Sequence, residues 1–136
     1  MKRKTFLLYS AFGAAAIGLS SIQCRSKDSA TNKTLGQPLL LSHFCDKKTI
    51  RDMGIFYRKR MDAESSEGQL VHLLLRDATG KSIPESTDSA HLQTLLAQKI
   101  KEDFQAGNAL TLKGWVVSVT EARQWALFSL IYRNGN

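Results

Sequence analysis

The first 24 residues limit what this chain can fold into, because they carry the features of an export signal and not of a folded domain. A basic segment at residues 2–4 precedes the run Phe6–Ile22, which has no charged side chain, and Cys24 follows it. A basic segment followed by an apolar one directs a protein to a membrane and is commonly removed afterwards. The sequence therefore predicts a signal peptide over residues 1–23. Residues 38–136 remain to form one small core.

Two alternatives concern how this segment holds the protein at a membrane. The apolar run is short and only moderately hydrophobic for a permanent span of about 20 residues, which leaves a retained anchor as one alternative. Lipid attachment at Cys24 is the other, favoured by the polar segment 25–33, which suits a flexible tether over residues 24–37. Gln23 stands where bacterial lipoproteins usually carry a small residue.

The route of export is a separate question. Arg3-Lys4-Thr5-Phe6-Leu7 resembles the twin-arginine pattern Arg-Arg-x-Phe-Leu, with lysine as the second basic residue. An ordinary basic segment is the simpler interpretation. Either route places the protein in the cell envelope, anchored to a membrane on the periplasmic or outer side.

The charge of the chain argues against nucleic acid as a partner. The formal net charge of +7 falls to +4 without the three basic residues of the signal, because 16 Lys and Arg and 12 Asp and Glu then remain. The basic residues are spread out apart from Arg58-Lys59-Arg60, and no aromatic residues alternate with them as single-strand binding requires. This basic cluster is a solvated helix end in the simplest interpretation, with contact to anionic lipid headgroups as the alternative.

Cysteine and histidine residues form no metal-binding, redox or catalytic pattern. With lipid on Cys24, Cys45 has no disulfide partner and is expected to be a small buried hydrophobic residue. His43 lies two residues before Cys45, but this spacing matches no familiar zinc site. The sequence contains no phosphate-binding loop, G-x-S-x-G elbow, H-E-x-x-H helix or C-x-x-C pair. It therefore predicts no catalytic residue, no cofactor and no metal.

Apolar residues at helical spacing predict a mainly α fold, a small domain of about four helices. The first helix is capped by Asp46 and ends in the basic cluster. The second is expected to stop at Gly80 in a left-handed conformation. The third begins at Asp88 or Ser89 and ends at Gly107. The apolar faces of these helices consist of Ile50, Met53, Tyr57 and Met61; Leu70, Leu73 and Leu74; and Leu92, Leu95, Leu96, Ile100 and Phe104.

One short extended segment precedes the last helix. Leu110–Val117 is rich in β-branched and aromatic residues, which favour a strand. A single strand cannot satisfy its own backbone, so we expect it to pair with an extended piece near Pro38–Leu41 or to pack as a hook against the helices. Ser118 and Glu121 then have the spacing of a capping box, which begins a helix that runs toward Tyr132.

The carboxy-terminal segment resembles a known family. Gly114-Trp115-Val116-Val117-Ser118-Val119-Thr120-Glu121-Ala122-Arg123, preceded by Asp103-Phe104 and followed by Ala126-Leu127, is similar to the end of a family of small exported bacterial proteins. Members often bear twin-arginine signals, and Ile50–Tyr57 resembles their first helix. The family has no established enzymatic activity, so the resemblance implies an accessory or interaction protein. By analogy with the small subunits of membrane-associated flavin-dependent sugar and alcohol dehydrogenases, it also implies a larger exported partner, such as a redox enzyme.

The motif in this segment has two interpretations. Its candidate residues are Trp115, Ser118, Glu121, Arg123 and Trp125. In the structural interpretation both tryptophans are buried, Glu121 completes the cap, and Arg123 pairs with a carboxylate such as Asp103. In the other, the segment is a recognition patch, because Trp and Arg dominate interface hot spots.

Two functions follow from these alternatives. The first is a non-catalytic, membrane-tethered accessory protein that docks on a larger exported partner through part of residues 115–132. The second is a small binding or carrier lipoprotein for an apolar or envelope-derived ligand held among the helices.

Overall fold

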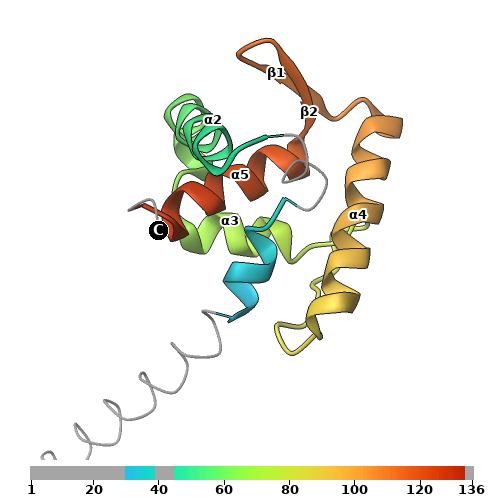
Figure 1. Ribbon diagram of the computed structural model, residues 1–136. Coiled ribbons are helices and arrows are strands. Elements are labelled where there is room, and N and C mark those ends of the chain that lie inside the picture. The colour runs from blue at the N-terminus through green and yellow to red at the C-terminus, as the bar shows by residue number, and fades with distance from the viewer. Residues whose placement is uncertain (1–29, 39–44, 134–136) are drawn as a thin grey trace, which may run out of the picture. The chain divides into compact units, whose positions relative to one another are not determined.

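Helices make up most of this protein in the computed structural model, which describes residues 30–38 and 45–133 (Figure 1). The predicted mainly α fold, with a short extended part before the last helix, is confirmed. Residues from Thr31 onward belong to one unit, whereas the predicted signal and Cys24 lie outside the described residues. In chain order the described elements are a helical segment over residues 30–35, α2 (Lys47–Arg60), the 3₁₀ helix η2 (Asp62–Glu64), α3 (Glu67–Leu74), α4 (Ser89–Ala106), β1 (Ala109–Leu112), β2 (Trp115–Ser118) and α5 (Val119–Ile131).

Most helix ends lie at the predicted caps. Asp46 and Asp88 each accept a backbone hydrogen bond at the starts of α2 and α4, and Gly107 ends α4 with a φ of 75°. Gly80 does not end α3, which already stops at Leu74. Its φ of 83° instead serves a short turn in the loop that leads to α4.

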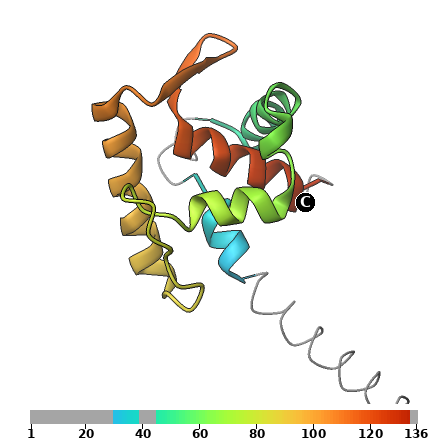
Figure 2. The same ribbon diagram turned by 180° about the vertical axis from the view of Figure 1, so that it is seen from behind.

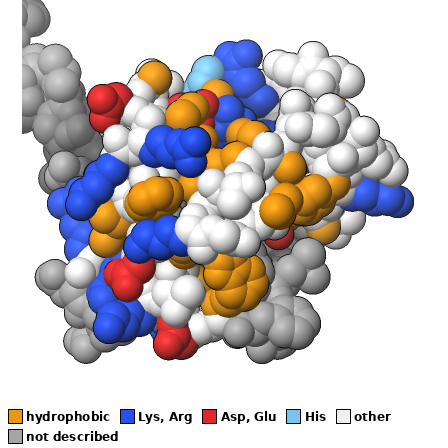
Figure 3. All heavy atoms as spheres, turned by 90° about the horizontal axis from the view of Figure 1, so that it is seen from above, with side chains coloured by type: hydrophobic (Ala, Val, Ile, Leu, Met, Phe, Trp, Pro, Cys, Tyr) orange, Lys and Arg blue, Asp and Glu red, His pale blue; other side chains and the backbone are white. Residues whose placement is uncertain are grey.

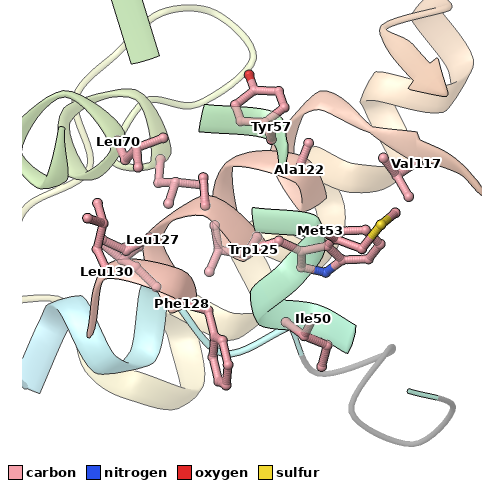
Figure 4. Close-up of a cluster of buried hydrophobic side chains, with 14 of the residues drawn as sticks. Ile50, Met53, Tyr57, Leu70, Val117, Ala122, Trp125, Leu127, Phe128 and Leu130 are labelled. Carbon is pink, nitrogen blue, oxygen red and sulfur yellow. The ribbon is translucent and has the colours of Figure 1, made fainter. Parts of the chain in front are cut away.

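The last helix, α5, forms the centre of the fold. It contacts α2, α3 and α4, and both ribbon views show it among these helices (Figures 1 and 2). Its residues 120–130 are all buried except the half-buried Arg123, as is typical of a helix surrounded by other elements. Ile50, Met53 and Tyr57 of α2 pack near Trp125 of α5 in this core (Figure 4).

Gly54 allows α2 and α5 to approach closely. A Cβ atom at this position would lie 2.0 Å from the carbonyl oxygen of Trp125, so a side chain on Gly54 would collide with the backbone of α5. Glycine is the residue that permits such an approach between two backbones.

The two strands pair with each other and form an antiparallel hairpin. Leu112 lies opposite Trp115, and the turn between them consists of Lys113 and Gly114, with φ values of 46° and 88°. Two consecutive positive φ values are typical of the type I′ turn, whose twist matches that of a hairpin. The turn thus lets the two halves of the predicted segment pair with each other. Residues 39–41 of the expected partner piece near Pro38–Leu41 lie outside the described residues.

The folded unit begins before the predicted boundary at residue 38. Residues 30–35 are helical, Leu35 is fully buried, and its carbonyl oxygen accepts a hydrogen bond of 3.0 Å from Nε2 of Gln124. The flexible tether predicted over residues 24–37 is therefore wrong for residues 31–37. One buried leucine in a polar segment fixes this part of the chain to α5.

Candidate functional site

The predicted capping box forms at the start of α5. The backbone N–H of Glu121 donates to Oγ of Ser118 at 3.0 Å, and the backbone N–H of Ser118 donates to Oε2 of Glu121 at 2.9 Å. Asp103 of α4 adds a third contact, because its Oδ2 accepts from the backbone N–H of Thr120 at 2.8 Å. These side chains satisfy amides that a helix leaves unpaired at its start. They hold α5 against α4 and the hairpin.

Arg123 pairs with a carboxylate, as the structural interpretation predicts, but the partner is Glu64 and not Asp103. Its Nε and Nη2 donate to the two carboxylate oxygens of Glu64, each at 2.9 Å. The hydroxyl of Tyr57 donates to the same carboxylate at 2.5 Å. Hydrogen bonding to Arg123 lowers the pKa of Glu64. Burial raises the pKa of Tyr57, and the hydrogen bond to Glu64 raises it further. The ion pair joins α2, η2 and α5 at one point.

Lys99 ties α4 to the end of α3. Its Nζ donates to the carbonyl oxygen of Leu73 at 2.7 Å. Burial lowers the pKa of Lys99 to about 8, and the positive charge of Arg123 contributes to the same shift. The negative charges of Asp103 and Asp77 oppose it. This lysine therefore bridges two helices at the cost of partial desolvation.

The two tryptophans of the motif have different environments. Trp125 is 2% exposed and lies in the core, as predicted, whereas Trp115 is 48% exposed, so the prediction that it is buried is wrong. The indole N–H of Trp125 has no hydrogen-bond partner among the described residues.

Both tryptophan rings line a shallow apolar depression with Cys45, Thr49, Ile50 and Met53. This depression encloses no water-sized volume and so offers a carried ligand no interior space.

The hairpin presents apolar side chains to solvent beside positive charges. Trp115 is half exposed, and Val116 is 66% exposed. The Nζ of Lys113 lies 5.4 Å from the centroid of the Phe56 ring, and Nη1 of Arg60 donates to a carbonyl oxygen of β1 at 3.4 Å. These contacts hold the hairpin against α2. We refer to Arg60, Lys113, Trp115 and Val116 as the hairpin surface.

Figure 3 views the molecule from the end that carries the hairpin. Hydrophobic side chains are scattered among Lys and Arg on this face, and Lys and Arg cover more of it than Asp and Glu do. The basic cluster Arg58-Lys59-Arg60 lies in the last turn of α2, as predicted, where positive charge complements the helix dipole.

Sequence spacing did not indicate the partner of Arg123. Glu64 precedes Arg123 by 59 residues, and no local pattern connects an acidic residue in a 3₁₀ turn to an arginine on the last helix. The hairpin did have a signal. Lys113-Gly114 between two short, mostly apolar stretches is a two-residue turn with glycine at a position that requires a positive φ.

The remaining candidate residues form no further site in the described part of the chain. Cys45 is a half-buried free thiol packed against the core, while His43 and Cys24 lie outside the described residues. Residues 30–38 and 45–133 contain no group of three or more His, Cys, Asp or Glu side chains placed to hold a metal ion. Within the same ranges, no helix combines the length and the apolar character needed to cross a membrane.

The chain matches no known protein family, and no curated protein or solved structure is significantly similar to it.

Proposed function

We propose that this protein is a membrane-tethered, exported accessory protein that docks on a larger exported partner and has no catalytic role of its own. The observation that supports this function is the hairpin surface, where Trp115 and Val116 remain exposed on a short hairpin held by α2. The two residues are neighbours on β2, so their side chains point to opposite faces of the hairpin and leave both faces partly apolar at this end. Exposed aromatic residues of this kind are frequent in protein contacts.

The docking surface is narrower than residues 115–132, the range that the sequence suggested. Almost all of α5 is buried by α2, α3 and α4, so it offers no face to a partner. Ser118 and Glu121 are occupied with each other, and Arg123 with Glu64. Within the motif, only the hairpin end remains available.

The location in the cell envelope is supported by the basic and apolar amino-terminal segment and by Cys24. The proposal is that lipid on Cys24 holds the protein at a membrane. Metabolic labelling with a fatty acid analogue tests it, with labelling expected for the unaltered protein and not for Cys24→Ala. Equal labelling of both, or a soluble protein that retains residues 1–23, would contradict the lipid anchor.

The docking function is tested by chemical cross-linking in intact cells, followed by mass spectrometry. We expect the protein in a defined complex with a larger exported protein, and the resemblance to dehydrogenase small subunits suggests a redox enzyme as that protein. Recovery of the monomer alone would contradict the accessory role. A lipid or other small molecule bound in stoichiometric amount would favour a carrier instead.

A further inference from the structure

We propose that the hairpin surface, with the adjoining face of α2, docks on an acidic surface of a partner protein and faces away from the membrane that anchors this chain. This inference rests on the proposed function and names the chemistry of the partner. It follows from three properties of the hairpin end, namely its charge, its free strand edge and its place in the fold.

The charge on this side of the molecule is strongly positive. α2 contains six Lys and Arg residues and a single acidic residue, Asp52. Arg60 at the end of α2 contacts β1, and Lys113 in the hairpin turn contacts Phe56 of α2. Both residues nevertheless remain exposed. Among the acidic residues of the neighbouring elements, Glu64 pairs with Arg123, and Asp103 holds the start of α5. Asp52 and Asp62 are exposed, but these two carboxylates do not balance the six basic residues of α2 and Lys113. Carboxylates of a partner would therefore complement the charge of this side of the molecule.

The free edge of β2 favours a polypeptide as this partner. Leu112 and Trp115 pair across the turn, so the next pair, Thr111 and Val116, directs its backbone groups away from the hairpin. On the β1 edge a carbonyl oxygen accepts from Arg60, whereas on the opposite edge no described residue outside the hairpin bonds to the backbone of Val116. An unpaired strand edge can bond to an extended segment of another chain, and a lipid surface offers no equivalent.

The position of the hairpin argues against the anchoring membrane as its occupant. The segment that leads to the anchor enters the fold at the amino-terminal end of α4, where Thr34 contacts Ser89 and Thr31 contacts Glu85. The hairpin begins at the other end of α4, and both ribbon views show the two at opposite ends of the molecule (Figures 1 and 2). The 18 residues of α4 separate them by about 27 Å.

The length of the tether agrees with this orientation. Only residues 25–30 lie between Cys24 and Thr31, and even fully extended they reach about 25 Å. A fold turned with its hairpin directly on the membrane would hold Thr31 at a height of about the length of α4, so the tether would have to be almost fully extended. A hairpin turned away from the membrane requires no such extension, and this is the orientation that we propose.

Site-specific photo-cross-linking in intact cells tests the inference with the full chain. A photoreactive amino acid replaces Val116 in one variant and Glu85, an exposed residue at the opposite end, in a matched control. We expect a discrete protein adduct from position 116 and little or none from position 85. Mass spectrometry then identifies the cross-linked segment of the partner, which we expect to lie beside Asp or Glu residues.

Charge variants separate the acidic partner from any other. The double variant Arg60→Glu with Lys113→Glu should reduce the yield of the adduct from position 116 about tenfold or more. The control Lys33→Glu with Lys81→Glu changes the net charge by the same amount and should leave this yield unchanged. Replacing the partner's cross-linked carboxylate residue by Lys should restore the adduct with the first variant. Thermal melts verify that both variants fold.

The remaining outcomes would overturn the inference in distinct ways. A protein adduct from position 85 alone would refute this surface and leave the docking function standing. Lipid adducts alone at position 116 would refute a protein occupant, and equal yields from both charge variants would refute an acidic one. No protein adduct at either position would contradict the docking function itself.

Discussion

Trp125 and Trp115 belong to the same motif but contribute differently to stability. Trp125 is buried between α2 and α5, and replacing a buried aromatic side chain by Ala costs about 3–5 kcal/mol. We expect Trp125→Ala to lower the free energy of unfolding by this amount, a large part of the total for a small domain. Urea unfolding followed by circular dichroism measures it.

Trp115→Ala is the matched control for this substitution. Because about half of Trp115 is already in water, its loss should cost half as much, about 2 kcal/mol. Equal destabilisation by the two variants would show that Trp115 supports the fold and not a surface.

The ion pair of Arg123 and Glu64 makes stability depend on pH. The pKa of Glu64 in the folded protein lies below its ordinary value of 4.5, chiefly through hydrogen bonds from Arg123. The pair therefore stabilises the fold above pH 4.5, and this contribution is lost as the pH falls through the lowered pKa. At pH 7 the free energy of unfolding of the wild type should exceed that of Glu64→Gln by about 1–3 kcal/mol. Below pH 4.5 this difference should shrink.

Denaturant titrations of both proteins between pH 3 and pH 7 measure this difference. Asp62→Asn is the control, since the carboxylate of Asp62 is exposed and lies in the same turn. A difference between wild type and Glu64→Gln that stays constant down to pH 3 would contradict the assignment.

At the scale of elements, the contact of α2 with α5 depends on a single glycine. Gly54→Ala places a methyl group 2.0 Å from a backbone oxygen of α5, so the helices must separate. Overpacking of this kind costs about 1–3 kcal/mol and occasionally more. Gly68→Ala in α3 meets nothing within 4 Å and should be neutral or stabilising by up to about 1 kcal/mol. Thermal melts of the pair test this, and equal melting temperatures would refute the close approach.

Elements could be predicted from the sequence where their determinants lie within a few residues. Asp46, Asp88 and Gly107 act on neighbouring backbone groups, so their spacing was sufficient to place α2 and α4. Met61 and Phe104 continue the same apolar spacing, yet both are exposed because they lie at helix ends that no other element covers. Periodicity describes one face of a helix, whereas burial depends on what packs against it.

The candidate site was less predictable for the same reason. The capping box is local, and it was predicted correctly. The partner of Arg123, the exposure of Trp115 and the role of Leu35 depend on contacts between distant parts of the chain. A spacing pattern contains no information on such contacts.

The whole domain includes a segment that its sequence assigns to the tether. Leu35 is fully buried, and replacing a buried leucine by Ala costs about 2–5 kcal/mol. A chain that begins at residue 31 should therefore melt at about the temperature of the longer protein, whereas one that begins at residue 39 should melt much lower. Differential scanning calorimetry on the two truncated chains measures these melting temperatures. Identical values would show that residues 31–38 belong to the tether and not to the folded domain.

The central position of α5 has a consequence for the order of events during synthesis. This helix is the last of the described elements, and α2, α3 and α4 each bury their apolar faces against it. Until the ribosome has released these final residues, the preceding helices have no common core to pack on. Under the export that we propose, the amino-terminal segment would therefore reach the export machinery before these helices can fold. A premature stop anywhere before residue 119 would remove the core itself, and such products should be degraded instead of accumulating as shortened domains.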